Sequence, residues 1–292
     1  MRSLLFSPGD DRHKIDKAFA SDADAVIFDL EDSVAPDNKA AARDITLAAL
    51  MEHSDNENLP QIYVRINALP TGLADDDLSA VVQAKPHGIM FPKSNGAQDL
   101  ATLASMLAPL EDQAGIVKPL GVIVLATETA QSLFTMGTYV EADPRLEALT
   151  WGAEDLSAEL GAVTNKDENG IHTDPYRLAR TLCLAGARAA GVTPIDTVYV
   201  NYKDSEGFRT ECETAVRDGF TAKLAIHPAQ VPIINEVFTP SNDDIVRAEK
   251  IISAFAQADN AGVIGLDGEM LDQPHLIRAQ DLLKRAKAYG PA

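Results

Sequence analysis

The segment Ala25-Val26-Ile27-Phe28-Asp29-Leu30-Glu31-Asp32 joins a continuous apolar run to a cluster of acidic residues. A run that is apolar at every position indicates a strand buried on both faces, as in a parallel sheet. Similar runs occupy residues 2–7, 62–66, 88–91, 120–125, 148–151, 196–200 and 223–226. Helical patterns between them include residues 38–52, 97–110, 175–190 and 229–238. This alternation predicts a (β/α)8 TIM barrel, with a doubly wound open sheet as the alternative.

The pattern changes after the eighth run. Residues 243–258 have the periodicity of an amphipathic helix, Asp267-Gly268 is a tight-turn signal, and a last helix is predicted from Pro274 to about residue 288. We therefore expect two parts, a catalytic barrel over residues 1–240 and a C-terminal helical extension over residues 241–292. The extension would either cover the bottom of the barrel or cap an active site as a lid.

Composition excludes several classes of protein. The chain has 292 residues with 25 Lys and Arg against 44 Asp and Glu, a formal net charge of −19, which argues against nucleic acid or an anionic membrane as partner. No stretch reaches the roughly 20 uncharged apolar residues of a membrane helix. Cys183 and Cys212 form no disulfide framework, so a cytoplasmic protein is expected. Motifs of nicotinamide, P-loop, serine-hydrolase and zinc enzymes are missing from the sequence.

In a barrel of this kind, reactive residues lie at the carboxyl ends of the strands and in the loops that follow. Charged and polar residues gather at these ends in nearly every unit of the chain. They are Asp29, Glu31, Asp32, Arg65, Asn67, Lys93, Glu128, Glu154, Asp155 and His227.

Glu128 and Asp155 are the most informative pair. They are separated by 27 positions, about one β/α unit, so they are expected on adjacent strands. Two facing carboxylates repel each other unless a cation or a proton lies between them, and Mg²⁺ suits such oxygen ligands. The alternative is that each carboxylate caps the helix that follows it.

Two basic residues allow alternative interpretations. Arg65 ends an apolar strand, where a guanidinium is suited either to bind a substrate carboxylate or to form a salt bridge with Asp29 or Glu31. Lys93 follows Phe91-Pro92 and is a candidate for a Schiff base or for an electrostatic role, and nothing local favours the covalent role.

The sequence resembles the HpcH/HpaI aldolase family, in its citrate lyase β-subunit-like, CoA-ester lyase branch. The matching motifs occur in order along nearly the whole chain. They are Leu5-Phe6-Ser7-Pro8-Gly9-Asp10, residues 23–34, residues 39–43, Val64-Arg65-Ile66-Asn67, Pro92-Lys93, Thr127-Glu128-Thr129, residues 151–156, Ala225-Ile226-His227-Pro228-Ala229-Gln230 and residues 267–275.

The resemblance implies a TIM barrel that uses Mg²⁺, with Glu128 and Asp155 as metal ligands. It implies that Arg65 binds the substrate carboxylate and that the backbone amides of Gly152 and Ala153 also hold the oxo acid. Trp151 stands where the family more often has Phe, which leaves the size of the accepted acid open.

The acidic strand end Asp29, Glu31 and Asp32 matches family positions near the metal-bound waters. Lys93 matches a family lysine that assists substrate binding and forms no Schiff base. Asp272 matches an aspartate that acts as acid and base and reaches the site of a neighbouring subunit, which implies a homotrimer or a dimer of trimers.

The implied reaction is cleavage of a 3-hydroxyacyl-CoA of the malyl-CoA or citramalyl-CoA type to acetyl-CoA and glyoxylate or pyruvate. Alternatives are a malyl-CoA thioesterase or malate-synthase-like enzyme, a citrate lyase β subunit that works in a complex, and an aldolase that acts without CoA. Arg12, Lys14 and Lys17 are candidates to bind the CoA phosphates or form a solvated helix face.

Overall fold

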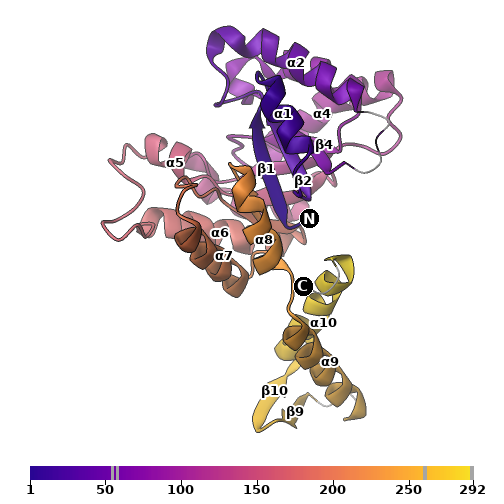
Figure 1. Ribbon diagram of the computed structural model, residues 1–292, viewed down its shortest axis with the longest axis vertical. Helices are drawn as coiled ribbons and strands as arrows, with labels where there is room; N and C mark the ends of the chain where they lie inside the picture. Colours follow the sequence, from indigo (N-terminus) through magenta and orange to yellow (C-terminus); the bar gives the residue numbers. More distant parts are fainter. Residues whose placement is uncertain (54–55, 57–58, 259–261, 290–292) are drawn as a thin grey trace. The chain divides into compact units, whose positions relative to one another are not determined.

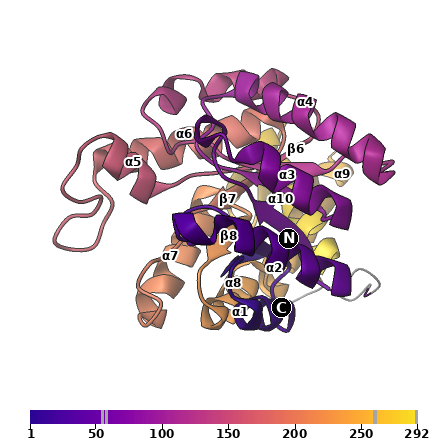
Figure 2. The same ribbon diagram turned by 90° about the horizontal axis from the view of Figure 1, so that it is seen from above.

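The computed structural model describes residues 1–53, 56, 59–258 and 262–289. Within them, eight parallel strands pair in chain order and close into a barrel, because β1 also pairs with β8. Figures 1 and 2 show helices outside these strands. The expected TIM barrel is confirmed, and the open sheet is excluded.

The barrel strands are β1 (Ser3–Pro8), β2 (Ala25–Asp29), β3 (Gln61–Arg65), β4 (Gly88–Phe91), β5 (Gly121–Leu125), β6 (Leu146–Thr150), β7 (Thr193–Asp196) and β8 (Ala222–Ala225). The helices are α1 (Arg12–Phe19), α2 (Lys39–Glu52), α3 (Ala74–Val81), α4 (Ala97–Ala114), α5 (Ala153–Glu159), α6 (Asp174–Ala190), α7 (Ser205–Asp218), α8 (Val231–Phe238), α9 (Asn242–Gln257) and α10 (Gln273–Tyr289). Short 3-10 segments are η1 (Pro36–Asn38), η2 (Leu69–Thr71), η3 (Val82–Ala84), η4 (Gln131–Phe134), η5 (Met136–Glu141) and η6 (Pro228–Gln230).

The seventh strand differs from the sequence prediction. It spans Thr193–Asp196, whereas the apolar run at residues 196–200 had predicted a strand there. Pro194 lies within the strand, and proline is an unusual strand residue, which obscured the signal. The residues after Asp196 form a loop in which the backbone carbonyl of Tyr199 accepts a hydrogen bond from Gln230 Nε2 at 2.9 Å.

Inward-facing side chains of all eight strands fill the barrel. This buried cluster consists of Leu4, Ala25, Ile27, Tyr63, Met90, Ile123, Leu125, Ala148, Ile195, Ala222 and Leu224. Because side chains alternate along a strand, the positions that follow Ile27 and Tyr63 on the same face are Asp29 and Arg65. The apolar filling therefore gives way to charged groups at the carboxyl end of the barrel.

The chain divides into two compact units, Met1–Ile234 and Asn235–Ala292. In the second unit, α9 and α10 pack together with the antiparallel hairpin of β9 (Val263–Leu266) and β10 (Glu269–Asp272). The hairpin turns at Asp267 and Gly268, with φ values of 51° and 84°, as two-residue turns of this kind require. The turn and helix expectations for this region are confirmed.

Gly88 lies at a tightly packed position at the amino end of the barrel. A Cβ at Gly88 would overlap the backbone oxygen of Gly121 and lie 2.7 Å from Tyr63 Cε1, so the strands themselves would have to shift. We expect Gly88→Ala to destabilise the protein by about 1–3 kcal/mol, a typical cost of overpacking. Differential scanning calorimetry would measure the loss, with Gly137→Ala as control because its Cβ meets nothing within 4 Å. Equal melting temperatures for the two variants would contradict this account.

Candidate active site

An ion pair between neighbouring strands forms the floor of the site. The strand register places Asp29 opposite Arg65, and the guanidinium donates from Nε and Nη2 to the two Asp29 oxygens, each at 2.7 Å. The Arg65 guanidinium also lies 5.0 Å from the centroid of the Phe6 ring. Burial acts to raise the pKa of Asp29, but Arg65 outweighs it and holds that pKa below its usual value. The predicted salt bridge is therefore present.

Glu31 and Lys93 extend this pair. Glu31 Oε2 lies 3.0 Å from Arg65 Nη1, and Lys93 Nζ donates to Glu31 Oε1 at 2.6 Å. Lys93 Nζ is also 3.1 Å from both Asp32 Oδ2 and Asp155 Oδ1. Burial acts to lower the pKa of Lys93, but the carboxylates of Glu31, Asp155 and Glu128 raise it above its usual value. A Schiff base requires a neutral amine, so the surroundings of Lys93 disfavour the covalent role.

Glu128 is a buried carboxylate of the group, with 3% of its surface exposed. The backbone N–H of Lys93, a residue with a left-handed φ of 52°, donates to Glu128 Oε2 at 2.7 Å. Burial, followed by repulsion from Asp155 and Glu31, raises the pKa of Glu128 well above its usual value. A Cβ at Gly152 would lie 2.9 Å from Glu128 Cγ, so only glycine leaves room for this side chain.

The capping alternatives for the two acidic residues are wrong. The Glu128 carboxylate accepts from Lys93, and the next helical segment, η4, begins only at Gln131. Asp155 lies inside α5, whose N-cap position is Gly152. Glu128 and Asp155 instead follow the paired strands β5 and β6, as the spacing predicted.

Seven of the predicted side chains thus meet at one end of the barrel: five carboxylates (Asp29, Glu31, Asp32, Glu128 and Asp155) and two cations (Arg65 and Lys93). Gly152 and Ala153 border this acidic cluster at the start of α5. Asp272 lies in the second unit, at the end of β10.

The acidic cluster fits a hard divalent cation. On formal charges it carries three more negative than positive charges, and Glu31 Oε2 is buried with no hydrogen bond beyond its ion pair with Arg65. No group of three or more His, Cys, Asp or Glu residues in the described chain is arranged to hold a metal. Glu128 and Asp155 would therefore supply two ligands, and water and substrate oxygens the rest, which is the usual arrangement for Mg²⁺.

A buried charge network behind the barrel wall was not found from the sequence. Lys223 of β8 is fully buried, and its Nζ donates to Asp196 Oδ2 at 2.9 Å and Glu211 Oε1 at 2.8 Å. Trp151 Nε1 donates to the same Asp196 carboxylate at 2.7 Å, and the His172 ring packs edge-on against the indole. A lysine inside a short apolar strand was the available signal, because a buried charge needs a partner.

The basic residues of α1 are mostly paired with carboxylates. Arg12 contacts Asp16 and Glu52, each at 2.7 Å, and Lys14 Nζ lies 3.3 Å from Asp11. These contacts favour the solvated helix face over a phosphate site for these two residues.

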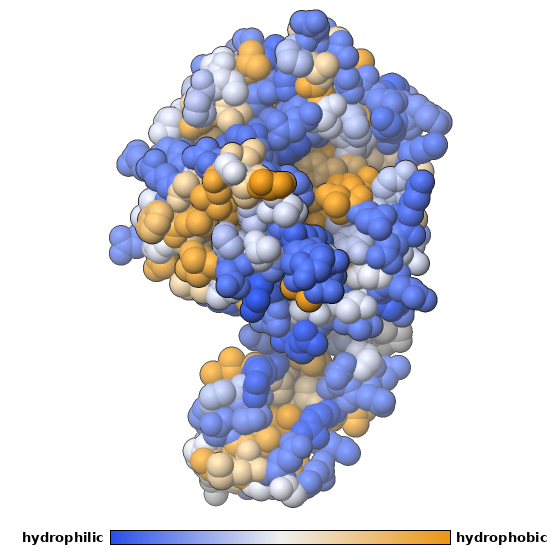
Figure 3. Space-filling model, turned by 90° about the vertical axis from the view of Figure 1, so that its left-hand side faces the viewer, coloured by the Kyte–Doolittle hydropathy of each residue, from blue (hydrophilic) through white to orange (hydrophobic). Residues whose placement is uncertain are grey.

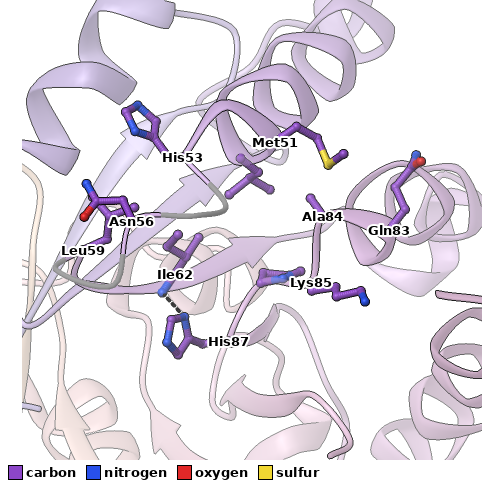
Figure 4. A pocket seen from close by; sticks show the side chains of 11 residues that line it. Met51, His53, Asn56, Leu59, Ile62, Gln83, Ala84, Lys85 and His87 are labelled. Atoms are coloured by element: carbon purple, nitrogen blue, oxygen red, sulfur yellow. Dashed lines mark hydrogen bonds between the residues drawn. The ribbon is translucent and has the colours of Figure 1, made fainter. Parts of the chain in front are cut away.

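A pocket of about 460 Å³ lies at the opposite end of the barrel (Figure 4). Its lining includes the end of α2, Ile62 at the start of β3, and the residues between η3 and β4. His87 Nδ1 accepts the Ile62 N–H at 2.9 Å there. None of the predicted site residues lines this pocket.

The family profile described as HpcH/HpaI aldolase/citrate lyase matches residues 2–228. The chain belongs to this family. A (3S)-malyl-CoA thioesterase of Cereibacter sphaeroides is 37% identical over 99% of this chain and 95% of its own. The mitochondrial citramalyl-CoA lyase of Rattus norvegicus is 32% identical over 98% of this chain and 86% of its own.

Solved structures of the family agree in fold. A crystal structure of the protein CitE from Mycobacterium tuberculosis, in complex with magnesium, acetoacetate and coenzyme A, is 32% identical and covers 98% of both chains with a TM-score of 0.81. The present chain therefore shares its fold, over almost its entire length, with a relative that binds magnesium, acetoacetate and coenzyme A.

Part of the protein surface is apolar. Figure 3 shows apolar patches among polar side chains on one face of the molecule. Independently of that view, Phe134 after β5 and Val163 after β6 are among the most exposed apolar side chains. Of the helices in the described part of the chain, none combines the length and apolarity needed to cross a bilayer.

Because the pKa of Glu128 is raised, we expect this residue to lower the stability of the folded protein in a pH-dependent way when divalent cations are removed with EDTA. In the unfolded chain Glu128 has its usual pKa, whereas in the folded protein its pKa is higher, so the folded protein binds the proton more tightly. The folded protein therefore loses stability as the pH rises above the usual pKa of glutamate. We expect Glu128→Gln to melt at a higher temperature than the wild type at pH 8, with a smaller difference at pH 5. Thermal unfolding in EDTA at both pH values measures this, and exposed Glu159→Gln is the control.

The Lys223 network predicts a large loss of stability in Lys223→Met. This change keeps the apolar stem but leaves the Asp196 and Glu211 carboxylates without the ammonium between them. We expect a loss of about 3–5 kcal/mol, as for other broken buried pairs, in urea unfolding followed by Trp151 fluorescence. Exposed Lys118→Met should stay within about 0.5 kcal/mol of the wild type; a Lys223 variant that matches it would contradict the assignment.

Proposed function

We propose that the chain is a Mg²⁺-dependent carbon–carbon lyase that cleaves a 3-hydroxyacyl-CoA of the malyl-CoA or citramalyl-CoA type. The products would be acetyl-CoA and a 2-oxo acid, glyoxylate or pyruvate. The observation that carries this proposal is the buried carboxylate of Glu128 at the mouth of the barrel. It lies near the carboxylate of Asp155 and the guanidinium of Arg65, in a cluster with excess negative charge. The magnesium, acetoacetate and coenzyme A held by the solved relative support it.

Arg65 would hold the substrate carboxylate. The guanidinium has five N–H donors, and Asp29 takes two of them while Glu31 lies beside Nη1. Donors at the Nη atoms therefore remain for a carboxylate, and Asp29 holds the guanidinium in one orientation. The N–H groups of Gly152 and Ala153 at the start of α5 would bind the same acid.

Glu128 and Asp155 would hold Mg²⁺, which lowers the pKa of the substrate hydroxyl and stabilises the developing carbonyl oxygen. Lys93 would keep Glu31, Asp32 and Asp155 in place by its three ion pairs. Transfer of the hydroxyl proton to a water molecule and cleavage of the adjacent carbon–carbon bond would give the oxo acid and the enolate of acetyl-CoA.

Asp272 would give its proton to the enolate carbon, or remove it in the synthetic direction. We propose that the C-terminal extension brings Asp272 to the active site of a neighbouring subunit, in a homotrimer or a dimer of trimers. Within this proposal the extension is part of the catalytic machinery.

Thioester hydrolysis is a second candidate, because the Cereibacter sphaeroides relative at 37% identity is named a (3S)-malyl-CoA thioesterase. The same ion and Arg65 would hold the acid while water attacks the thioester carbonyl. A third candidate is a subunit that works only within a complex, since a citrate lyase β subunit of Haemophilus influenzae is 32% identical.

The test is incubation of the purified chain with malyl-CoA and with citramalyl-CoA, with Mg²⁺ or EDTA, followed by mass spectrometry. We expect Mg²⁺-dependent formation of acetyl-CoA plus glyoxylate or pyruvate. Asp272→Ala should lower kcat by about 10²–10⁴-fold, the usual contribution of a general acid or base. Asp281→Ala is the control, because this exposed aspartate lies on α10, the helix that directly follows Asp272.

Each other outcome selects a different function. Free CoA with intact malate or citramalate would identify a thioesterase. No turnover of either ester would refute the lyase proposal for the isolated chain and favour a subunit that depends on a partner.

A further inference from the structure

Asp272 has a close partner in the second unit. It is the last residue of β10, and His275 lies in the first turn of α10, which begins at Gln273. His275 Nδ1 is 2.6 Å from Asp272 Oδ1, and the backbone N–H of Asp272 donates to the same Nδ1 at 3.2 Å. The side chains are 49% and 35% exposed for Asp272 and His275, so the pair is accessible from solvent.

The short distance requires a proton between Nδ1 and Oδ1, because two lone pairs would repel each other at this separation. The proton belongs either to the imidazole, which then donates to a carboxylate, or to the carboxyl group, which then donates to a neutral ring. The Asp272 N–H is directed at Nδ1 and favours the second form, whereas the carboxylate charge favours the first. In the first form, Nδ1–H donates to Oδ1 and leaves Oδ2 free of this contact.

We propose that His275 is the positioning residue for Asp272, an assignment that rests on the lyase function proposed above. Nδ1 engages Oδ1 and fixes the rotamer of the carboxyl group, which leaves Oδ2 to face the substrate carbon. When the O–H bond at Oδ2 breaks, the electron pair of the enolate forms the new C–H bond and Asp272 becomes a carboxylate. The Nδ1–H donor of His275 stabilises that new charge at Oδ1.

A purely structural role makes a different prediction. A first-turn side chain that accepts the backbone N–H of the residue just before the helix is half of a capping box, and its loss weakens the helix start. That role would lower the stability of the second unit and leave turnover by the folded enzyme unchanged. Turnover and stability must therefore be measured separately.

The experiment compares His275→Ala, His275→Asn and His275→Gln with the wild type in the CoA-ester assay. The amide nitrogen of Asn lies near the position of Nδ1, whereas that of Gln lies nearer Nε2. We expect His275→Ala and His275→Gln to lower kcat about 10-fold or more at nearly constant KM, and His275→Asn to recover most of the loss. Unchanged kcat in His275→Ala, or no advantage of Asn over Gln, would overturn the proposal.

A second measurement does not depend on turnover. Nitrogen-15 NMR of the intact, histidine-labelled chain should show a proton on Nδ1 of His275, and the proton should move to Nε2 in Asp272→Ala but not in Asp281→Ala. An identical His275 signal in all three proteins would overturn the pairing. If the NMR result holds while the wild type cleaves no CoA ester, the pairing stands and the lyase function fails.

Discussion

The structure depends on holding five carboxylates close together at the mouth of a barrel. Asp29 and Glu31 are neutralised in part by Arg65, and Lys93 bridges Glu31 to Asp155. Glu128 receives only a backbone N–H from within this cluster and carries a pKa raised by burial. An isolated buried carboxylate is costly in a low-dielectric environment. The cost of this burial is the physical basis of the cation site proposed here.

The barrel supplies the rigidity that this charge cluster needs. Parallel pairing sets Asp29 beside Arg65 and brings the segments after β5 and β6 together. The residue before Gly152 is Trp151, whose indole is bonded to Asp196, and Asp196 is held by the buried ammonium of Lys223. The loop that borders Glu128 is thus anchored by buried charges outside the acidic cluster, and these residues preserve the geometry of the site.

Much of the fold and site was predictable because it follows from local order in the chain. Each buried strand is apolar at nearly every position, and polar residues follow where the strand ends, as in Phe28-Asp29 and Val64-Arg65. The closed topology makes all these ends meet at one mouth. The seventh strand was predicted at the wrong residues because Pro194 interrupts its apolar pattern. The strand itself is short, with only four residues, Thr193–Asp196.

The sequence by itself therefore determined the barrel, the hairpin at Asp267-Gly268 and the residue types at the mouth, because these depend on periodicity and on backbone conformation. Only the tertiary structure decided how the charges pair. It placed Lys93 between Glu31 and Asp155, and it joined Trp151 to Asp196 and Lys223. Such partners lie tens of residues apart in the chain. Their pairing is set by strand register and by the cost of burying an unpaired charge, and neither is a property of a local segment.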